Sequence, residues 1–170
     1  IEDEDTEALK NLLIIGGSPQ GARPKALIKF DSTNNRVSTL PTAAGDDWLV
    51  KFPARGENQS VCAAEHVYAQ LAKQCGLNMP DTQFFDLGSG YGAFGVKRFD
   101  RDNGMRIHVH TLAGLLNTNF RLPTLSYTQL LRCIRALTHS ELEVIQGYRQ
   151  CVFNVVFHNR DDHSKNFSFM

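Results

Sequence analysis

The sequence predicts an α+β fold with two lobes, a sheet-rich lobe over residues 1–102 and a helical lobe over residues 103–170. Two observations lead to this prediction. Up to Asp100, short apolar runs alternate with charged residues and are separated by Gly- and Asn-rich stretches, as expected for strands and turns. Beyond Asp100, apolar residues recur at helical spacing, so the change of period marks the boundary between the lobes.

The sheet-rich lobe is expected to begin with a helix over residues 2–13, whose acidic first turn complements the helix dipole. Strands are predicted at 25–30 and 48–52, because apolar and charged residues alternate in the first and an apolar run ends at Pro53 in the second. The polar segment between these strands is rich in Asn, Thr and Gly, so it is predicted to be a loop or a weak hairpin.

A helix and a hairpin are expected to complete this lobe. The helix has one apolar face and should stop at Gly76. Strands at 83–87 and 93–99 flank the glycine-rich segment 88–92, which is typical of a hairpin connection. The letters of a G-x-G-x-x-G motif occur at 90–95, but a strand rather than a helix follows them, which argues against a dinucleotide-binding loop.

The helical lobe is predicted to contain a short helix at 112–116, a longer one at 127–137, and a third that begins after Ser140. Ser140 and Glu143 have the spacing of a capping box. A helix of this kind turns its apolar face toward a core. In the third helix, that face consists of Leu142, Ile145, Tyr148, Val152, and Val155 or Val156.

Composition excludes some classes of function. The chain has 18 Lys and Arg against 18 Asp and Glu, so it lacks the basic excess of a dedicated nucleic-acid-binding surface. Its four cysteines form no C-x-x-C pair and are expected to be buried thiols in a reducing cytoplasm. No apolar run is long enough to span a membrane, so no membrane contact is expected. The apolar run at 167–170 ends without a turn signal, and we therefore expect the native chain to continue.

Asp161 and Asn166 carry the sharpest functional signal. In protein kinases, a catalytic Asp precedes an Asn metal ligand by the same interval, and Arg160 supplies the Arg of the H-R-D string. Such a loop can hold both a base for the substrate hydroxyl and a ligand for Mg²⁺. The alternative interpretation is a polar turn after a helix, and Asn159 stands where the kinase pattern has His.

Lys51 is the second candidate, because it places one ammonium group in an otherwise apolar strand. Such a lysine must reach solvent or be paired. Glu65, in the following helix, is its candidate partner, and the two would form a kinase-like pair of strand lysine and helix glutamate. An edge-strand lysine and a solvated glutamate are the alternative.

Two further segments contain candidate ligand-binding residues. The loop at 16–25 is not a Walker A motif, but its glycines could let backbone N–H groups approach phosphates. A plain turn is the alternative for this loop. The pair His108 and His110 and the cluster at 158–163 leave a metal-dependent hydrolase open as a weaker hypothesis, although a third ligand set is missing.

Taken together, five segments resemble the HipA family of bacterial kinase toxins. They are similar to the family's G-A-x-x-K loop, its strand ending in Lys-hydrophobic-Pro, its N-lobe helix, its hinge string V-x-R-F-D-R and its catalytic loop D-x-H-x-K-N. The corresponding residues are 21–26, 48–53, 63–76, 96–101 and 161–167. The resemblance implies a protein-kinase-like core and an ATP- and Mg²⁺-dependent serine/threonine protein kinase.

The resemblance also implies roles for single residues. Asp161 would be the catalytic base, Asn166 a Mg²⁺ ligand, and Glu65 the partner of Lys51. Ser18 stands where the family carries a self-phosphorylated serine that switches the enzyme off. The nucleotide would be bound by Gln20, Gly21, Ala22, Arg23, Pro24, Lys25, Lys51, His163, Ser164, Lys165 and Asn166, and its adenine by the backbone of Lys97, Arg98 and Phe99.

The resemblance further implies a bacterial cytoplasmic toxin–antitoxin system. The partner would be a HipB-type antitoxin, through which alone DNA would be contacted, and the target a protein such as an aminoacyl-tRNA synthetase. The family's second metal-binding aspartate, much of its helical C-lobe and an N-terminal subdomain are not in these 170 residues, so the implied activity belongs to a longer chain. The alternative is a kinase-like scaffold without catalysis that binds an antitoxin.

Overall fold

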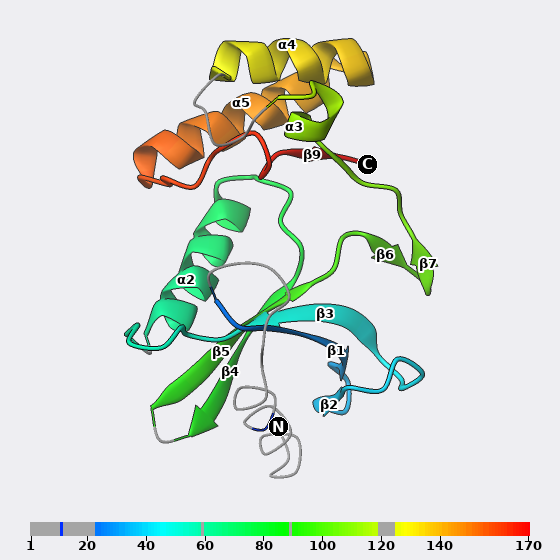
Figure 1. Ribbon diagram of the computed structural model, residues 1–170, viewed down its shortest axis with the longest axis vertical. Helices are drawn as coiled ribbons and strands as arrows, with labels where there is room; N and C mark the ends of the chain where they lie inside the picture. Colours follow the sequence, from blue (N-terminus) through cyan, green and yellow to red (C-terminus); the bar gives the residue numbers. More distant parts are fainter. Residues whose placement is uncertain (1–10, 12–22, 59, 89, 119–124) are drawn as a thin grey trace. The chain divides into compact units, whose positions relative to one another are not determined.

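The computed structural model describes residues 11, 23–58, 60–88, 90–118 and 125–170. The described residues divide into two compact units, of which the first holds those up to Leu71 together with those of Met79–Arg101, and the second holds Ala72–Asn78 with those of Asp102–Met170 (Figure 1). Apart from Asn11, the helix predicted at 2–13 lies outside the described residues, as do Ser18, Gln20, Gly21 and Ala22.

The first unit is built on a five-stranded antiparallel sheet with the strand order β2-β1-β3-β5-β4. The strands are β1 (Lys25–Asp31), β2 (Arg36–Ser38), β3 (Asp46–Lys51), β4 (Thr82–Gly88) and β5 (Tyr91–Lys97). The strands predicted at 25–30, 48–52 and 83–87 are therefore confirmed, and the polar segment after β1 forms a hairpin of β1 and β2. Asp31 closes its turn by accepting hydrogen bonds from the N–H groups of Thr33 and Asn34.

Two apolar clusters lie on opposite faces of this sheet. Ile28, Phe30, Trp48, Val50 and Phe52, which alternate along β1, β3 and the residue after β3, form a buried cluster with residues of β4 and β5. The other face packs against helix α2 (Val61–Gln74) through Cys62, Ala69 and Phe94 (Figure 1). Alternation therefore directs even-numbered residues of β1 and β3 into one core and leaves the odd-numbered ones on the opposite face.

The hairpin of β4 and β5 is tighter than expected. The sequence placed its turn at 88–92, but Tyr91 and Gly92 belong to β5, and β5 ends at Lys97 rather than at Phe99. Gly92 and Gly95 lie in the strand because the rings of Phe84 and Phe85 occupy the space of a Cβ, which would come within 2.3 and 2.4 Å of them. The G-x-G-x-x-G letters therefore mark a hairpin and its packing.

The second unit contains α3 (Leu112–Leu115), α4 (Tyr127–Thr138) and α5 (Glu141–Val156), so the predicted helices are confirmed. Ser126 and Gln129 form a reciprocal capping box at α4, and the Ser140 side chain accepts a hydrogen bond from the Glu143 N–H at α5. In Figure 1, α4 lies along α5. The two helices approach closely at Gly147, where a Cβ would lie 2.4 Å from Ile134 Cδ1.

The prediction for the apolar face of α5 was wrong. Gly147, Cys151 and Asn154 are the buried residues of this helix. The predicted face is exposed among the described residues, from 43% at Val152 to 75% at Leu142. The physical reason is the close approach at Gly147, because α4 packs against the side of α5 that carries the small residues.

Short strands after Asp100 were also missed. β6 (Arg101–Asp102) and β7 (Met105–Arg106) form a two-stranded hairpin, and β8 (His110–Thr111) pairs with β9 (Ser168–Phe169). Asn103 and Gly104 connect β6 and β7 with φ angles of 47° and 80°. Asn-Gly with positive φ at both positions is a strong hairpin signal. It was overlooked because the residues after Asp100 were assigned to the helical lobe.

No helix in the described part of the chain is long and apolar enough to cross a membrane. All four cysteines are free thiols, as predicted. Cys62 and Cys151 are buried, whereas Cys75 is exposed and Cys133 is half-buried, so burial was predicted correctly for only part of the set.

Candidate functional site

Lys25 and Lys51 lie directly opposite each other in the β1–β3 ladder, so both side chains leave the same face of the sheet. This face is the one against which α2 packs. The next opposite pair on it is Leu27 and Leu49, and Leu49 in turn lies opposite Val96 on β5. Leu27 is 59% exposed. The sheet therefore places an accessible apolar patch of Leu27, Leu49 and Val96 beside two ammonium groups.

The sequence interpretation missed this patch. Leu27 and Leu49 were recognised only as strand residues, although each stands two positions from a lysine that was singled out. Period-two alternation could have assigned them to the lysine face, because residues i and i+2 of a strand point the same way.

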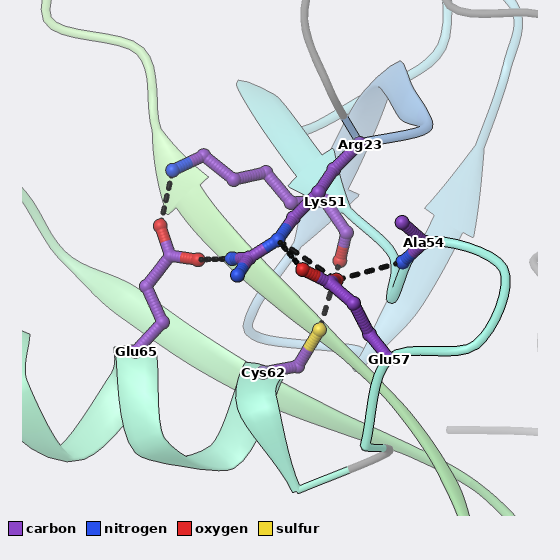
Figure 2. Close-up of polar contacts among 6 residues, drawn as sticks. All are labelled: Arg23, Lys51, Ala54, Glu57, Cys62 and Glu65. Carbon is purple, nitrogen blue, oxygen red and sulfur yellow. Dashed lines mark hydrogen bonds and ion pairs between the residues drawn. The ribbon is translucent and has the colours of Figure 1, made fainter. Parts of the chain in front are cut away.

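Lys51 is held from three sides. Its ammonium group forms an ion pair with Oε1 of Glu65 in α2 and lies 5.4 Å from the centre of the Phe94 ring. Its backbone carbonyl accepts a hydrogen bond of 3.5 Å from the buried thiol of Cys62. Figure 2 shows Lys51 and Glu65 pointing toward each other from β3 and α2. The structure thus joins the two residues that the sequence offered as a pair.

Arg23 also reaches Glu65. Its Nη1 lies 3.2 Å from Oε2 of Glu65, and its Nε lies 2.9 Å from Oε2 of Glu57, in the loop after β3. The N–H of Ala54 donates to the Glu57 carboxylate, and this bond and the guanidinium of Arg23 hold the pKa of Glu57 below its usual value. Two cations and two carboxylates, from the segment before β1, from β3, from α2 and from the loop after β3, are therefore joined in one cluster.

The segment that follows β5 is organised around Asp100. Arg98 donates to both carboxylate oxygens of Asp100, at 2.8 and 2.7 Å, and Arg101 Nη1 lies 2.8 Å from Oδ2. These arginines, Arg98 above all, lower the pKa of Asp100. The N–H groups of Lys97 and Arg98 donate to the carbonyls of Asp81 and Asp47.

These bonds restrict how the segment could meet an adenine. Among the backbone groups predicted to receive the adenine, the N–H groups of Lys97 and Arg98 are engaged within the protein. A base would therefore have to be recognised by the carbonyl groups of the segment or by the N–H of Phe99, whose ring is 52% exposed.

The loop after α5 is held by asparagines. Asn154, buried in α5, accepts a hydrogen bond of 3.0 Å from the Asn159 side chain, and Asn159 Oδ1 accepts one of 3.1 Å from the Asp161 N–H. Asn166 closes the loop by donating from Nδ2 to the Asp161 carbonyl. Asn159, which stands at the His position of the kinase H-R-D string, therefore links Asn154 of α5 to the backbone of Asp161.

The two adjacent aspartates of this loop have different environments. The Asp161 side chain is 81% exposed, and its Oδ1 lies 3.2 Å from Nε2 of His163. Asp162 accepts a hydrogen bond from the Tyr127 hydroxyl of α4. Burial and this bond raise the pKa of Tyr127 to about 12. Asp161 is thus available to a reacting group, whereas Asp162 ties the loop to α4.

The remaining loop residues differ in accessibility. Ser164 is 8% exposed, and its carbonyl accepts a hydrogen bond of 3.0 Å from the N–H of Ala113 in α3. Lys165 and Asn166 are exposed. No group of three His, Cys, Asp or Glu side chains within the described ranges could hold a metal ion, and the rings of His108 and His110 are 6.2 Å apart.

The sequence model of the HipA-like C-terminal domain matches residues 17–170, which is nearly the whole chain. The chain belongs to this family. The HipA-like domain is also similar in structure to HipA of Shewanella oneidensis MR-1, solved in complex with HipB and operator DNA, with a TM-score of 0.69 and 22% sequence identity. The match covers 99% of this chain and 46% of that HipA, so the HipA-like domain spans about half the length of its relative. No curated protein matches it significantly. The predicted family and the α+β, protein-kinase-like fold class are confirmed.

Proposed function

We propose that the full-length protein is an ATP-dependent serine/threonine protein kinase. The observation that carries this proposal is the ion pair between Lys51 of β3 and Glu65 of α2. Such a pair fixes an ammonium group where it can contact phosphates, which is the role of the strand lysine in protein kinases. Membership of the HipA-like family supports the same reaction.

The first unit supplies groups suited to a nucleotide. Lys25 and Lys51 offer two ammonium groups for phosphates on one face of the sheet. Leu27, Leu49 and Val96 offer an apolar surface for a flat base on the same face. The segment Lys97–Phe99 would recognise the edge of the adenine, and Arg23 and Pro24 end the loop that would cover the phosphates.

The second unit supplies groups suited to the transfer itself. Asp161 is exposed and would accept the proton of the attacking serine or threonine hydroxyl. Lys165 would contribute positive charge toward the nucleotide, His163 would line it, and Ser164 would hold the loop on α3. The bond from Asn166 Nδ2 to the Asp161 carbonyl leaves the amide oxygen for a cation.

ATP would supply the phosphoryl group, and Mg²⁺ on its phosphates would neutralise the charge that develops during transfer. The donor set present fits this chemistry in part. Asn166 offers one hard oxygen ligand and Asp161 lies beside it, whereas the family's second metal-binding aspartate has no counterpart in these 170 residues.

The biological setting follows from the relatives. The similar HipA was solved with HipB and operator DNA, and we propose a HipB-type antitoxin as the partner of the full-length protein, with DNA contacted through that partner. We further propose that the protein acts in the bacterial cytoplasm and phosphorylates itself at Ser18. Its target would be a protein such as an aminoacyl-tRNA synthetase.

Incubation of the full-length protein with ATP and Mg²⁺, followed by intact-mass and peptide mass spectrometry, tests the proposal. A gain of one phosphate that maps to Ser18 and requires Mg²⁺ is expected. A protein that binds ATP but gains no phosphate, and that modifies no synthetase in the same mixture, would instead be a kinase-like scaffold.

A further inference from the structure

Arg23 joins three segments that surround Lys51. It precedes β1, and its guanidinium contacts Glu57 in the loop after β3 and Glu65 in α2 (Figure 2). About 30% of the Arg23 side chain is exposed. Because Nε points at one carboxylate and Nη1 at the other, the side chain is oriented by two acids at once.

Glu65 is shared between two cations. Lys51 contacts its Oε1, and Arg23 Nη1 lies 3.2 Å from its Oε2. Rotation of this carboxylate would weaken both contacts together. The rotamer of Glu65, and through it the place of the Lys51 ammonium group, therefore depends on Arg23.

Glu57 is itself fixed by its own turn. Its carboxylate accepts the Ala54 N–H at 2.8 Å, and its N–H donates to the Ala54 carbonyl at 3.0 Å. Next to this turn, the Phe52 N–H donates to the Pro24 carbonyl at 3.0 Å, which extends the pairing of β1 with β3 by one step. The carboxylate that Arg23 contacts is therefore fixed by the hydrogen-bonded turn at 54–57.

We propose that Arg23 is a positioning residue that sets Glu65, and hence Lys51, and that fastens the chain before β1 to the turn at 54–57. Its consequence for catalysis rests on the proposed kinase function. The guanidinium acts through the two glutamates, because its Nε and Nη1 are both directed at their carboxylates.

Positioning and simple charge predict opposite results for Glu57. If only charge mattered, Glu57→Gln would remove a negative group near the phosphates and raise the affinity for ATP. If Glu57 holds Arg23 in place, the same change lowers it. We expect Arg23→Gln and Glu57→Gln each to weaken ATP binding by about three- to tenfold. The double variant should bind ATP no more weakly than the worse single variant, because both changes remove the same Arg23–Glu57 ion pair.

Arg36→Gln is the matched control, since Arg36 is an exposed arginine on β2 of the same sheet. It should leave ATP affinity unchanged. Titration calorimetry of the full-length variants with ATP and Mg²⁺ measures all four affinities. Tighter binding by Glu57→Gln, or additive losses in the double variant, would overturn the positioning role.

Amide hydrogen exchange tests the fastening without any nucleotide. Arg23→Gln should speed exchange at Phe52 and Ala54, whose acceptors are the Pro24 carbonyl and the Glu57 carboxylate, and Arg36→Gln should not. Unchanged exchange at both amides would refute the proposal whether or not the protein binds ATP. Failure of the wild type to bind ATP would refute the kinase function instead, and the exchange result would still decide the role of Arg23.

Discussion

Lys25 and Lys51 face each other across the β1–β3 ladder, and only Lys51 has a carboxylate partner among the described residues. Like charges at directly opposite positions destabilise a sheet. We therefore expect the Lys25 charge to lower the stability of the nucleotide-free protein, and an anion bound beside the two lysines would offset this cost. Residues at functional sites often carry such a local conflict.

The lysine pair leads to a prediction with two opposite signs. Lys25→Met should raise the stability of the nucleotide-free protein by about 0.5 kcal/mol, because it removes the repulsion. The same change should weaken ATP binding by roughly 1.5–3 kcal/mol, because a charge-assisted contact is lost. Thermal unfolding and calorimetric titration measure the two effects.

Lys29→Met serves as the control for this prediction. Lys29 lies on the same strand but pairs with Asp47 at 3.0 Å, so its loss should lower stability slightly and leave ATP affinity as it was. Equal ATP affinities for wild type, Lys25→Met and Lys51→Met would remove the phosphate role of both lysines.

Tyr127 leads to a prediction about pH. Its hydroxyl donates to Asp162, and its pKa is raised to about 12, from 10 in an unperturbed tyrosine. Tyr127 therefore keeps its hydroxyl proton to a higher pH in the folded state than in the unfolded state. The stability from this group is fully present below about pH 10 and is lost as the pH rises toward 12.

The measurement compares urea unfolding of wild type and Tyr127→Phe at neutral and at alkaline pH. At neutral pH the variant should be less stable by about 1–3 kcal/mol, because Asp162 loses its donor. The difference should shrink as the pH rises above about 10. Tyr148→Phe, at a 59% exposed position, should show neither effect. A difference that stays constant with pH would contradict the assignment.

Gly45, before β3, leads to a prediction about the fold alone. Its φ is +107°, and a Cβ there would lie 2.6 Å from the backbone carbonyl carbon of Phe30. Gly45→Ala should therefore lower the free energy of unfolding by about 2–4 kcal/mol, from strain and backbone overlap together. Gly56→Ala should have a smaller effect, about 1 kcal/mol, because Gly56 has a similar φ of +84° but open space around it. Equal losses in the two variants, measured by urea unfolding, would contradict this explanation.

Much of the fold was predictable because local patterns and tertiary packing agree. Alternation predicts β1, an apolar run that ends at Pro53 predicts β3, and the spacing of Ser140 and Glu143 predicts the start of α5. The hairpin at Asn103–Gly104 was missed although its signal is local, because the surrounding strands are only two residues long.

The face of α5 could not be predicted from periodicity. Its apolar residues occupy more than one side of the helix. The side that carries Gly147 is buried, because this small residue permits close contact with α4. Helix periodicity identifies an apolar face but does not identify which neighbour will cover it.

The candidate site was predictable only in part for a similar reason. Strand lysine, helix glutamate and loop aspartate could be proposed from residue type and spacing. Arg23 was predicted as a nucleotide contact, but its carboxylate partners lie 34 and 42 residues away, and no local pattern links them. The roles of Leu27 and Asn159 likewise depend on strand pairing and on a buried side chain of α5.

The rate of phosphate transfer from ATP in Asp161→Asn, compared with Asp162→Asn, tests the central claim most directly. Asp161 is exposed, so its replacement in the full-length protein should reduce the rate by about 10²–10⁴-fold while ATP binding and thermal stability persist. Asp162 is bonded to Tyr127, so its replacement should mainly lower stability. Transfer by Asp161→Asn at the rate of the wild-type protein would contradict the assignment of this loop to phosphoryl transfer.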